Sequence, residues 1–192
     1  AFYSMPGVAQ LPPGVTPEMI ASALPEEGAP RAEPGPHAVT SGPAFGAEGL
    51  KVFRPADLSH FAASERLPVV VWGNGGCAIE GARYAGFLET IASHGFVVVT
   101  TTSGAAAAPA PAASAPAAPG APRRQATAAD LAAGIDWAAR EDQRTGSPLA
   151  GRIDTKKVAV MGQSCGGRLS IELGADPRVK TIGVFNAGLQ PN

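Results

Sequence analysis

The chain has few of the residues that build metal centres and disulfide scaffolds, with only two cysteines and three histidines among its 192 residues. Two cysteines are too few to define a disulfide framework by their number. The 15 basic and 16 acidic side chains nearly cancel and form no basic stripe, so binding to nucleic acid or to an anionic membrane has no electrostatic support. No apolar run is long enough to span a bilayer. We therefore expect a globular domain without a membrane span, a metal or another cofactor.

Glycine and proline, by contrast, are abundant and gather in particular stretches. Residues 1–45 are rich in Pro, Gly and Ala, with one short helix predicted over Pro17–Leu24, and we expect an irregular arm ahead of a domain at 46–192. Residues 104–122 consist almost wholly of Ala and Pro, a composition that forms no packed core. We interpret them as a surface insertion in the domain, with an interdomain linker as the alternative.

Strand-like and helix-like segments alternate through the domain, which is typical of an α/β fold with a mostly parallel sheet and helices on its faces. Continuous apolar runs indicate central strands covered on both faces, whereas the alternating Leu50–Pro55 indicates a half-exposed strand. Thr127 and Asp130 have the spacing of a helix capping box. The predicted strands are Leu50–Pro55, Leu67–Trp72, Phe96–Thr100, Lys157–Met161 and Lys180–Phe185, and the predicted helices are Ala78–His94, Thr127–Asp142 and Gly167–Leu173.

The pentapeptide Gly162-Gln163-Ser164-Cys165-Gly166 directly follows one of these strands. A serine hydroxyl is a weak nucleophile, so an enzyme must expose it beside a base and an oxyanion-stabilising pocket. A G-x-S-x-G turn between strand and helix provides the exposure, and its outer positions must lack side chains for the turn to close. The predicted strand before it and helix after it supply this context. Ser164 is therefore a candidate nucleophile, and a glycine-rich turn with an incidental serine is the alternative.

A second glycine-rich segment, Gly73-Asn74-Gly75-Gly76-Cys77, follows the strand predicted at Leu67–Trp72. In α/β-hydrolases one oxyanion-binding N–H comes from the residue after the nucleophile, here Cys165, and the other from a loop in this position. The alternative is that these glycines only shape a tight turn. If both segments border one oxyanion, Cys77 and Cys165 lie near each other, and a disulfide between them is favoured over two buried free thiols. Such a bridge implies an exported protein, secreted or periplasmic.

From about Leu50 to Leu189 the chain resembles α/β-hydrolase-fold serine esterases of the dienelactone hydrolase, chlorophyllase and bacterial cutinase or polyester hydrolase group. The resemblance is carried by Leu67–Val71, the oxyanion loop, Ala92–Val99 and Ile153–Gly162 in that order. It implies Ser164 as nucleophile and Gly76 and Cys165 as oxyanion-hole residues. The polyester-cleaving members usually have His, Met and an aromatic residue where this chain has Gln163, Cys165 and Gly76. The implied substrate is a small-molecule or polymeric ester.

The acid and histidine of a catalytic triad are expected after the nucleophile in this fold. Only one aspartate, Asp176, follows Ser164, and the histidines are His37, His60 and His94, all before it. We therefore expect the chain to be the N-terminal part of a serine esterase that lacks its C-terminal strands, with a C-terminal segment or a second chain completing the fold. The alternative is a catalytically inactive, hydrolase-like binding or structural module.

Three aromatic residues, Trp72, Tyr84 and Phe87, could wall an apolar acyl site in such an enzyme. Their positions within the predicted strand and helix favour packing in the core instead.

Overall fold

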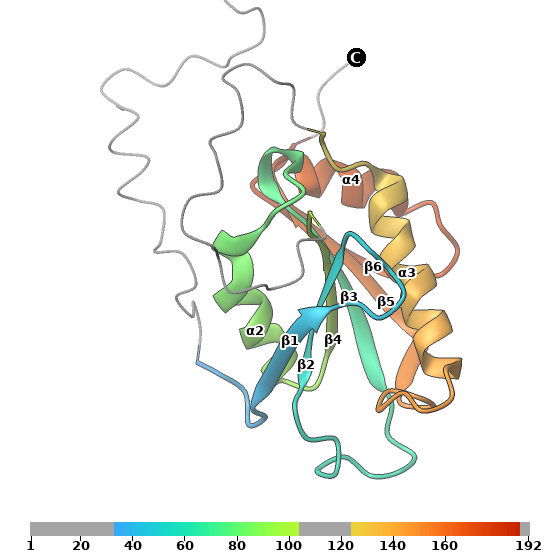
Figure 1. The fold of residues 1–192 in the computed structure, drawn as a ribbon. Helices are drawn as coiled ribbons and strands as arrows, with labels where there is room; N and C mark the ends of the chain where they lie inside the picture. The colour runs from blue at the N-terminus through green and yellow to red at the C-terminus, as the bar shows by residue number, and fades with distance from the viewer. Residues whose placement is uncertain (1–32, 104–123, 189–192) are drawn as a thin grey trace, which may run out of the picture.

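The computed structural model describes residues 33–103 and 124–188, so the helix predicted at 17–24 and the Ala/Pro stretch at 104–122 lie outside the described residues. The described residues form an α/β fold with a six-stranded sheet and helices packed on it (Figure 1). The strands are β1 (Val39–Pro43), β2 (Leu50–Pro55), β3 (Leu67–Gly73), β4 (Val97–Thr101), β5 (Ile153–Gln163) and β6 (Val179–Phe185). The helices are α2 (Ala85–Ser93), α3 (Ala128–Gln143) and α4 (Cys165–Leu173), with 3-10 turns η1 (Gly75–Cys77) and η2 (Ala82–Tyr84).

The sheet is mixed and mostly parallel, in the order β1-β2-β4-β3-β5-β6. Strand β3 pairs in parallel with both β4 and β5, and β5 pairs in parallel with β6. Strand β2 pairs antiparallel with β4 and with β1. The predicted mostly parallel α/β sheet is thus confirmed, and β3 lies near its centre.

Side chains alternate along the central strands and supply two cores, one on each face of the sheet. On one face the strand valines pack with Leu131 and Ile135 of α3, and α4 lies on the same side. On the other face Val70 and Trp72 of β3 pack with Leu88 of α2. Figure 1 shows α2 separated by the sheet from α3 and α4. The continuous apolar runs are therefore buried on both faces, as predicted.

The helix predicted over Ala78–His94 is shorter in the structure. It begins only at Ala85, after the 3-10 turn η2, and it ends at Ser93, ahead of Gly95 with φ +91°. The carbonyl oxygens of Ala78 and Ile79 accept hydrogen bonds from a side-chain amide of the preceding loop. Because those carbonyls are bound elsewhere, this part of the segment does not join the helix.

Strand β1 is a feature that the sequence pattern does not predict, because Val39–Pro43 contains no apolar run. It pairs residue by residue with β2, from Val39 opposite Pro55 to Pro43 opposite Lys51. Part of residues 1–45, which the sequence predicts to be an irregular arm, therefore contributes an edge strand to the sheet. Strand β2 is also more buried than the predicted half-exposed strand, because Phe53 is only 2% exposed and lies in the α2 core.

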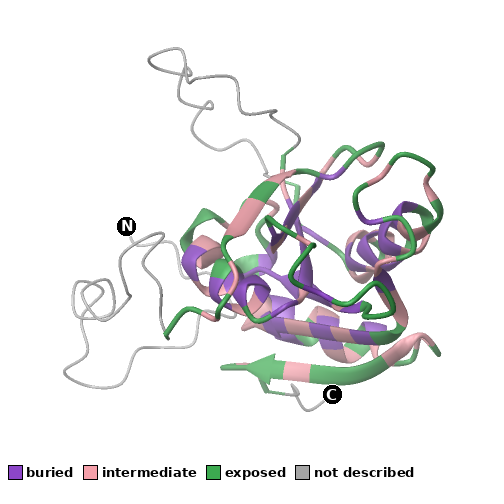
Figure 2. Cartoon of the chain, turned by 90° about the horizontal axis from the view of Figure 1, so that it is seen from below, coloured by how far each residue is buried: buried purple, intermediate pink, exposed green. Residues whose placement is uncertain are grey.

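Strand β6 forms the other edge of the sheet among the described residues. Its apolar side chains remain largely open, with Ile182 44%, Val184 39% and Phe185 42% exposed. Figure 2 shows this strand as a mostly exposed border beside the buried centre of the sheet. Edge strands are normally short, charged or covered, so an open apolar edge of this kind is unusual. No helix in the described ranges is long and apolar enough to cross a membrane.

The capping box of α3 gives a test of local stability. The Thr127 hydroxyl accepts from the Asp130 N–H, and the Asp130 carboxylate accepts from the Thr127 N–H. We expect Thr127→Ala to lower the free energy of unfolding by about 1 kcal/mol, measured by urea denaturation, because an orphan helix N–H loses its acceptor. Thr145→Ala, at an exposed turn position, is the control. Equal losses in the two variants would contradict a role of the cap.

Candidate active site

The two glycine-rich segments lie at the carboxyl ends of β3 and β5, where the connections that follow these strands run to opposite faces of the sheet. Gly73 at the end of β3 is paired with Gly162 near the end of β5. The chain leaving β3 leads to α2 on one face, whereas the chain leaving β5 leads to α4 on the other face. Such a divergence opens a crevice at the carboxyl ends of neighbouring parallel strands, where α/β proteins bind ligands. The sheet topology therefore brings both predicted segments to one place.

Ser164 lies in the sharp turn between β5 and α4, so the predicted strand and helix around it are confirmed. Its backbone has φ +53° and ψ −118°, a conformation that non-glycine residues rarely adopt. The Ser164 N–H donates to the carbonyl oxygen of Phe185 at 2.8 Å, so the end of β6 holds the turn in place. The residue is half-buried. Strain of this kind, maintained by surrounding contacts, is common at functional positions.

Close backbone contact explains the glycines of this turn. A Cβ at Gly73 would lie 2.8 Å from the Gly166 carbonyl oxygen, and a Cβ at Gly166 would overlap the Gly73 carbonyl group. A Cβ at Gly162 would overlap the same Gly166 carbonyl group. The two segments therefore touch through their main chains, with no room for side chains. The expectation that both outer positions of the pentapeptide need glycine is confirmed.

A disulfide joins the two segments covalently, between Cys77 of η1 and Cys165 at the start of α4, with their Cα atoms 5.1 Å apart. The predicted bridge is thus confirmed, and the alternative of two free thiols is wrong. The bridge is consistent with an oxidising extracellular or periplasmic space. The bridge thus joins Cys165, which follows Ser164, to Cys77, which follows Gly76.

The two candidate oxyanion donors have free N–H groups within the described part of the chain. Neither Gly76 nor Cys165 donates a main-chain hydrogen bond to another described residue. Cys165 is the first residue of α4, where N–H groups have no intrahelical acceptor and the helix dipole favours negative charge. Gly76 has φ +66°, which turns its peptide relative to its neighbours. These two N–H groups could bind a developing negative charge beside Ser164.

Asn74 is a residue of this site that the sequence pattern does not single out. It is fully buried, and its Nδ2 donates to the carbonyl oxygens of Ala78 and Ile79 and to the Thr101 hydroxyl. On the other side of the loop, the Ala126 N–H donates to the Cys77 carbonyl oxygen at 2.8 Å. The only feature of the sequence that points to this role of Asn74 is its position between two glycines, directly after a predicted strand. Asn74 fixes the shape of the loop that carries Gly76.

None of the three histidines lies near Ser164. His94 caps α2 just before β4 begins, and His60 lies in the connection from β2 to β3. The His37 ring is 6.2 Å from the His60 ring, and the main-chain N–H of His37 donates to the carbonyl oxygen of Ser93. All three are at the edge where the parallel strands begin, whereas Ser164 is where they end. A five- to seven-residue strand separates these edges by about 16 to 23 Å.

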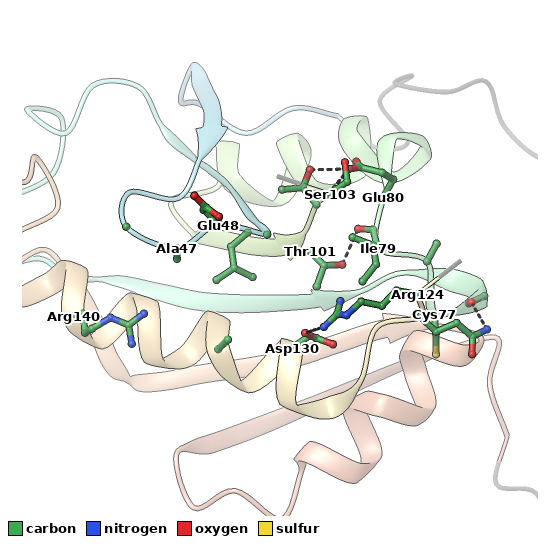
Figure 3. Close-up of a pocket in the computed structure, with 18 residues that line it drawn as sticks. Ala47, Glu48, Cys77, Ile79, Glu80, Thr101, Ser103, Arg124, Asp130 and Arg140 are labelled. Carbon is green, nitrogen blue, oxygen red and sulfur yellow. Dashed lines mark hydrogen bonds and ion pairs between the residues drawn. The ribbon is translucent and has the colours of Figure 1, made fainter. Parts of the chain in front are cut away.

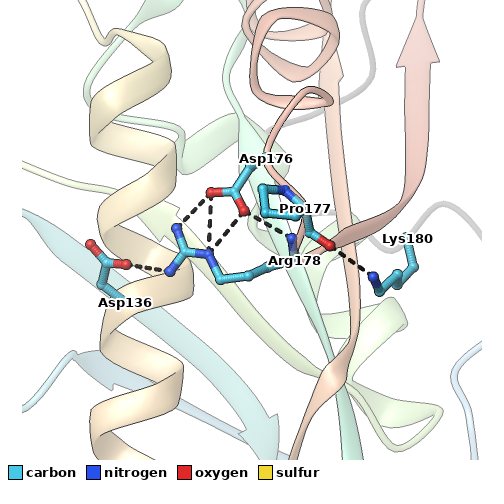
Figure 4. Close-up of polar contacts among 5 residues, drawn as sticks. All are labelled: Asp136, Asp176, Pro177, Arg178 and Lys180. Atoms are coloured by element: carbon cyan, nitrogen blue, oxygen red, sulfur yellow. Dashed lines mark hydrogen bonds and ion pairs between the residues drawn. The ribbon is translucent and has the colours of Figure 1, made fainter.

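Asp176 is also at the far edge, in the turn between α4 and β6, where it has a structural partner (Figure 4). Its carboxylate accepts from the Arg178 guanidinium and main-chain N–H, and Arg178 also binds Asp136 of α3. Hydrogen bonds from Arg178 lower the pKa of Asp176 to about 2. Asp176 therefore holds Arg178, the residue that pairs with Asp136 of α3, and is not placed to act with Ser164.

A cavity of about 1310 Å³ opens on one side of the oxyanion loop, between α3 and the end of β4. Gly76 and Cys77 are among its lining residues, and Arg124 and Asp130 form an ion pair in it (Figure 3). Ser164 is not among the described residues that line this cavity. The described part of the chain contains no group of three His, Cys, Asp or Glu side chains that could hold a metal ion.

No protein-family model matches this chain, and no curated protein matches it either. The case for Ser164 therefore depends on the turn, the glycine contacts and the disulfide described above.

The glycine contact can be tested by adding one methyl group. We expect Gly166→Ala to destabilise the protein by about 3 kcal/mol, because the new Cβ overlaps the Gly73 carbonyl group and both main chains must shift. Gly76→Ala is the matched control. Nothing lies within 4 Å of its new Cβ, so only the φ of +66° costs energy, about 1 kcal/mol. Denaturant unfolding of both variants measures the difference, and a smaller loss in Gly166→Ala would contradict the contact.

The Asp176 carboxylate gives a pH-dependent prediction. Its pKa of about 2 lies below the ordinary 3.8, so its contribution to stability is present above pH 4 and is lost as the pH falls towards 2. Asp176→Asn should cost about 1 to 2 kcal/mol at pH 7, a value reduced for the partly exposed Arg178. The gap from the wild type should shrink between pH 4 and pH 2. Asp136→Asn, at the more exposed partner of Arg178, should cost less. A gap that is independent of pH would refute the assignment.

Proposed function

We propose that this chain is the N-terminal part of a serine hydrolase of the α/β-hydrolase fold that cleaves carboxylic esters. The observation that carries the proposal is the junction at the carboxyl ends of β3 and β5. There a strained serine and two N–H groups without an acceptor among the described residues are held together by glycine contacts and the Cys77–Cys165 disulfide. A turn that was only a chain reversal would need neither the strained serine conformation nor the unpaired donors.

The chemistry follows from this arrangement. The Ser164 Oγ attacks the ester carbonyl carbon and transfers its proton to a base, while the carbonyl oxygen becomes negative and accepts from the Gly76 and Cys165 N–H groups. Collapse of the tetrahedral intermediate breaks the bond to the leaving alcohol, which takes the proton from the base. Water then hydrolyses the acyl-enzyme by the same steps and frees Ser164. Loss of one such oxyanion donor typically costs about 10²- to 10³-fold in rate.

The base and its acid belong, in this proposal, to polypeptide outside the chain. The described histidines and Asp176 are at the far edge of the sheet and cannot supply them. The apolar, uncovered edge of β6 supports a further segment, from the same or a second polypeptide, that adds strands there. New parallel strands beside β6 would end at the same edge as Ser164. Residues following those strands would then be within reach of the nucleophile.

A non-catalytic binding or structural module is the second candidate. It is favoured by one observation, which is that the three histidines and Asp176, all within residues 33–103 and 124–188, lie at the edge of the sheet opposite Ser164. The hydrolase and the non-catalytic module predict different gene sequences after the codon for Asn192. Continuation past Asn192 into further strands with an Asp and a Gly-His pair supports the hydrolase, whereas a stop codon there supports the module.

Covalent labelling tests the hydrolase directly. The full-length gene product should react with a fluorophosphonate, and peptide mapping by mass spectrometry should locate the adduct on the peptide containing Ser164, because only an activated serine attacks this reagent rapidly. Ser164→Ala should abolish both labelling and esterase activity. Ser59→Ala, in an exposed loop, should retain both. Labelling at another residue, or none, would overturn the proposal. Hydrolysis of chromogenic esters of increasing chain length then defines the acyl preference.

A further inference from the structure

The hydroxyl of Tyr84 lies between the two segments of the candidate site. It accepts a hydrogen bond from the Gly75 N–H at 3.1 Å and donates one to the Gln163 Oε1 at 2.8 Å. Gly75 belongs to the oxyanion loop, and Gln163 is the residue immediately before Ser164. A single phenol thus bridges both segments, with its one proton and one acceptor position each used.

The ring of Tyr84 is held in place by the core. It packs on Trp72 with ring centroids 5.3 Å apart, and Trp72 is only 2% exposed. A Cβ at Gly75 would overlap both the Tyr84 hydroxyl and the Gln163 amide, so only glycine lets these groups meet at this point. Because a tyrosine ring has few rotatable bonds, the packed ring places its hydroxyl with little freedom.

The hydrogen bonds of the Tyr84 hydroxyl and the disulfide join the two segments at matching positions. Gly75 and Gln163 each stand two residues before Cys77 and Cys165. On one segment, Gly76 lies between Gly75, which binds the Tyr84 hydroxyl, and Cys77. On the other, Ser164 lies between Gln163, which binds the same hydroxyl, and Cys165. Beyond the main-chain contact of Gly73 with Gly166, these two links restrict both the separation and the orientation of the residues between them.

We propose that Tyr84 and Gln163 are positioning residues of the oxyanion hole, an inference that rests on the proposed hydrolase function. Their hydrogen bonds hold the Gly76 N–H in a fixed place relative to Ser164. An oxyanion donor works only when it is fixed in advance at the position of the developing charge. Tyr84 therefore affects the chemical step and leaves the binding of the ground-state ester unchanged.

Kinetics of the full-length protein test this role. Tyr84→Phe keeps the ring contact with Trp72 and removes both hydrogen bonds. For a p-nitrophenyl ester we expect kcat to fall about tenfold with KM changed less than twofold, because a misplaced donor weakens only the transition state. Affinity for a trifluoromethyl ketone, which mimics the tetrahedral oxyanion, should fall by a similar factor. Gln163→Leu removes the same link from the other side and provides an independent variant if Tyr84→Phe fails to fold.

Thr90→Val is the matched control for a lost hydroxyl. The buried Thr90 hydroxyl donates to the Gly86 carbonyl oxygen inside α2 and does not touch the loop. This variant should lower the melting temperature without changing kcat. Reduction of the disulfide should lower the rate of Tyr84→Phe by a larger factor than it lowers the wild-type rate, because the two links act in parallel.

The outcomes separate the two proposals. Wild-type kcat in both Tyr84→Phe and Gln163→Leu, with Ser164 still labelled by fluorophosphonate, would overturn the positioning role alone. An equal fall of kcat in Thr90→Val would also overturn it, because the effect would then be one of general stability. A wild-type protein that is not labelled at Ser164 would overturn the hydrolase function, and the positioning role with it.

Discussion

Main-chain contact between Gly73 and Gly166 is the constraint on which the rest of the site depends. It allows the end of β3 to touch the start of α4 directly, with no side chain between them. This contact sets the direction in which α4 leaves the turn, and it brings Cys77 within bridging distance of Cys165. With one more methyl group at this contact, the Gly73–Cys77 segment and the Ser164 turn would have to separate.

The energies explain how a strained serine persists in this turn. Holding a non-glycine residue in a sparsely populated conformation costs about 1 to 3 kcal/mol. The disulfide joins residues 88 apart, and closing a loop of that length in the unfolded chain is worth about 4 to 5 kcal/mol in the chain-entropy model. The bridge therefore more than offsets the strain of Ser164. The hydrogen bond from Ser164 to Phe185 adds a tie to β6 on the other side.

The two edges of the sheet have different roles. The edge where the parallel strands begin carries ion pairs and aromatic contacts, such as Asp176 with Arg178 and His37 with Phe61. The edge where they end carries the turn, the loop and two N–H groups that have no acceptor among the described residues. Ion pairs hold the first edge together, whereas main-chain contacts, one disulfide and the side-chain hydrogen bonds of Asn74 and Tyr84 build the second, with the Arg124–Asp130 ion pair beside it. An oxyanion site needs such main-chain donors, because they cannot rotate away from the charge.

The sequence by itself determined the alternation of strands and helices, the α3 capping box and the turn at Ser164. These depend on local periodicity and on residues close together in the chain, as with Thr127 and Asp130. Tertiary structure decided that Val39–Pro43 becomes a strand, that α2 begins late at Ala85, and that Tyr84 reaches Gln163. Each of these needs a partner outside its own segment, such as β2 for β1, Thr101 for the Asn74 side chain that delays α2, or Gln163 for Tyr84. Local pattern carries no record of such partners, because they meet only when the sheet has formed.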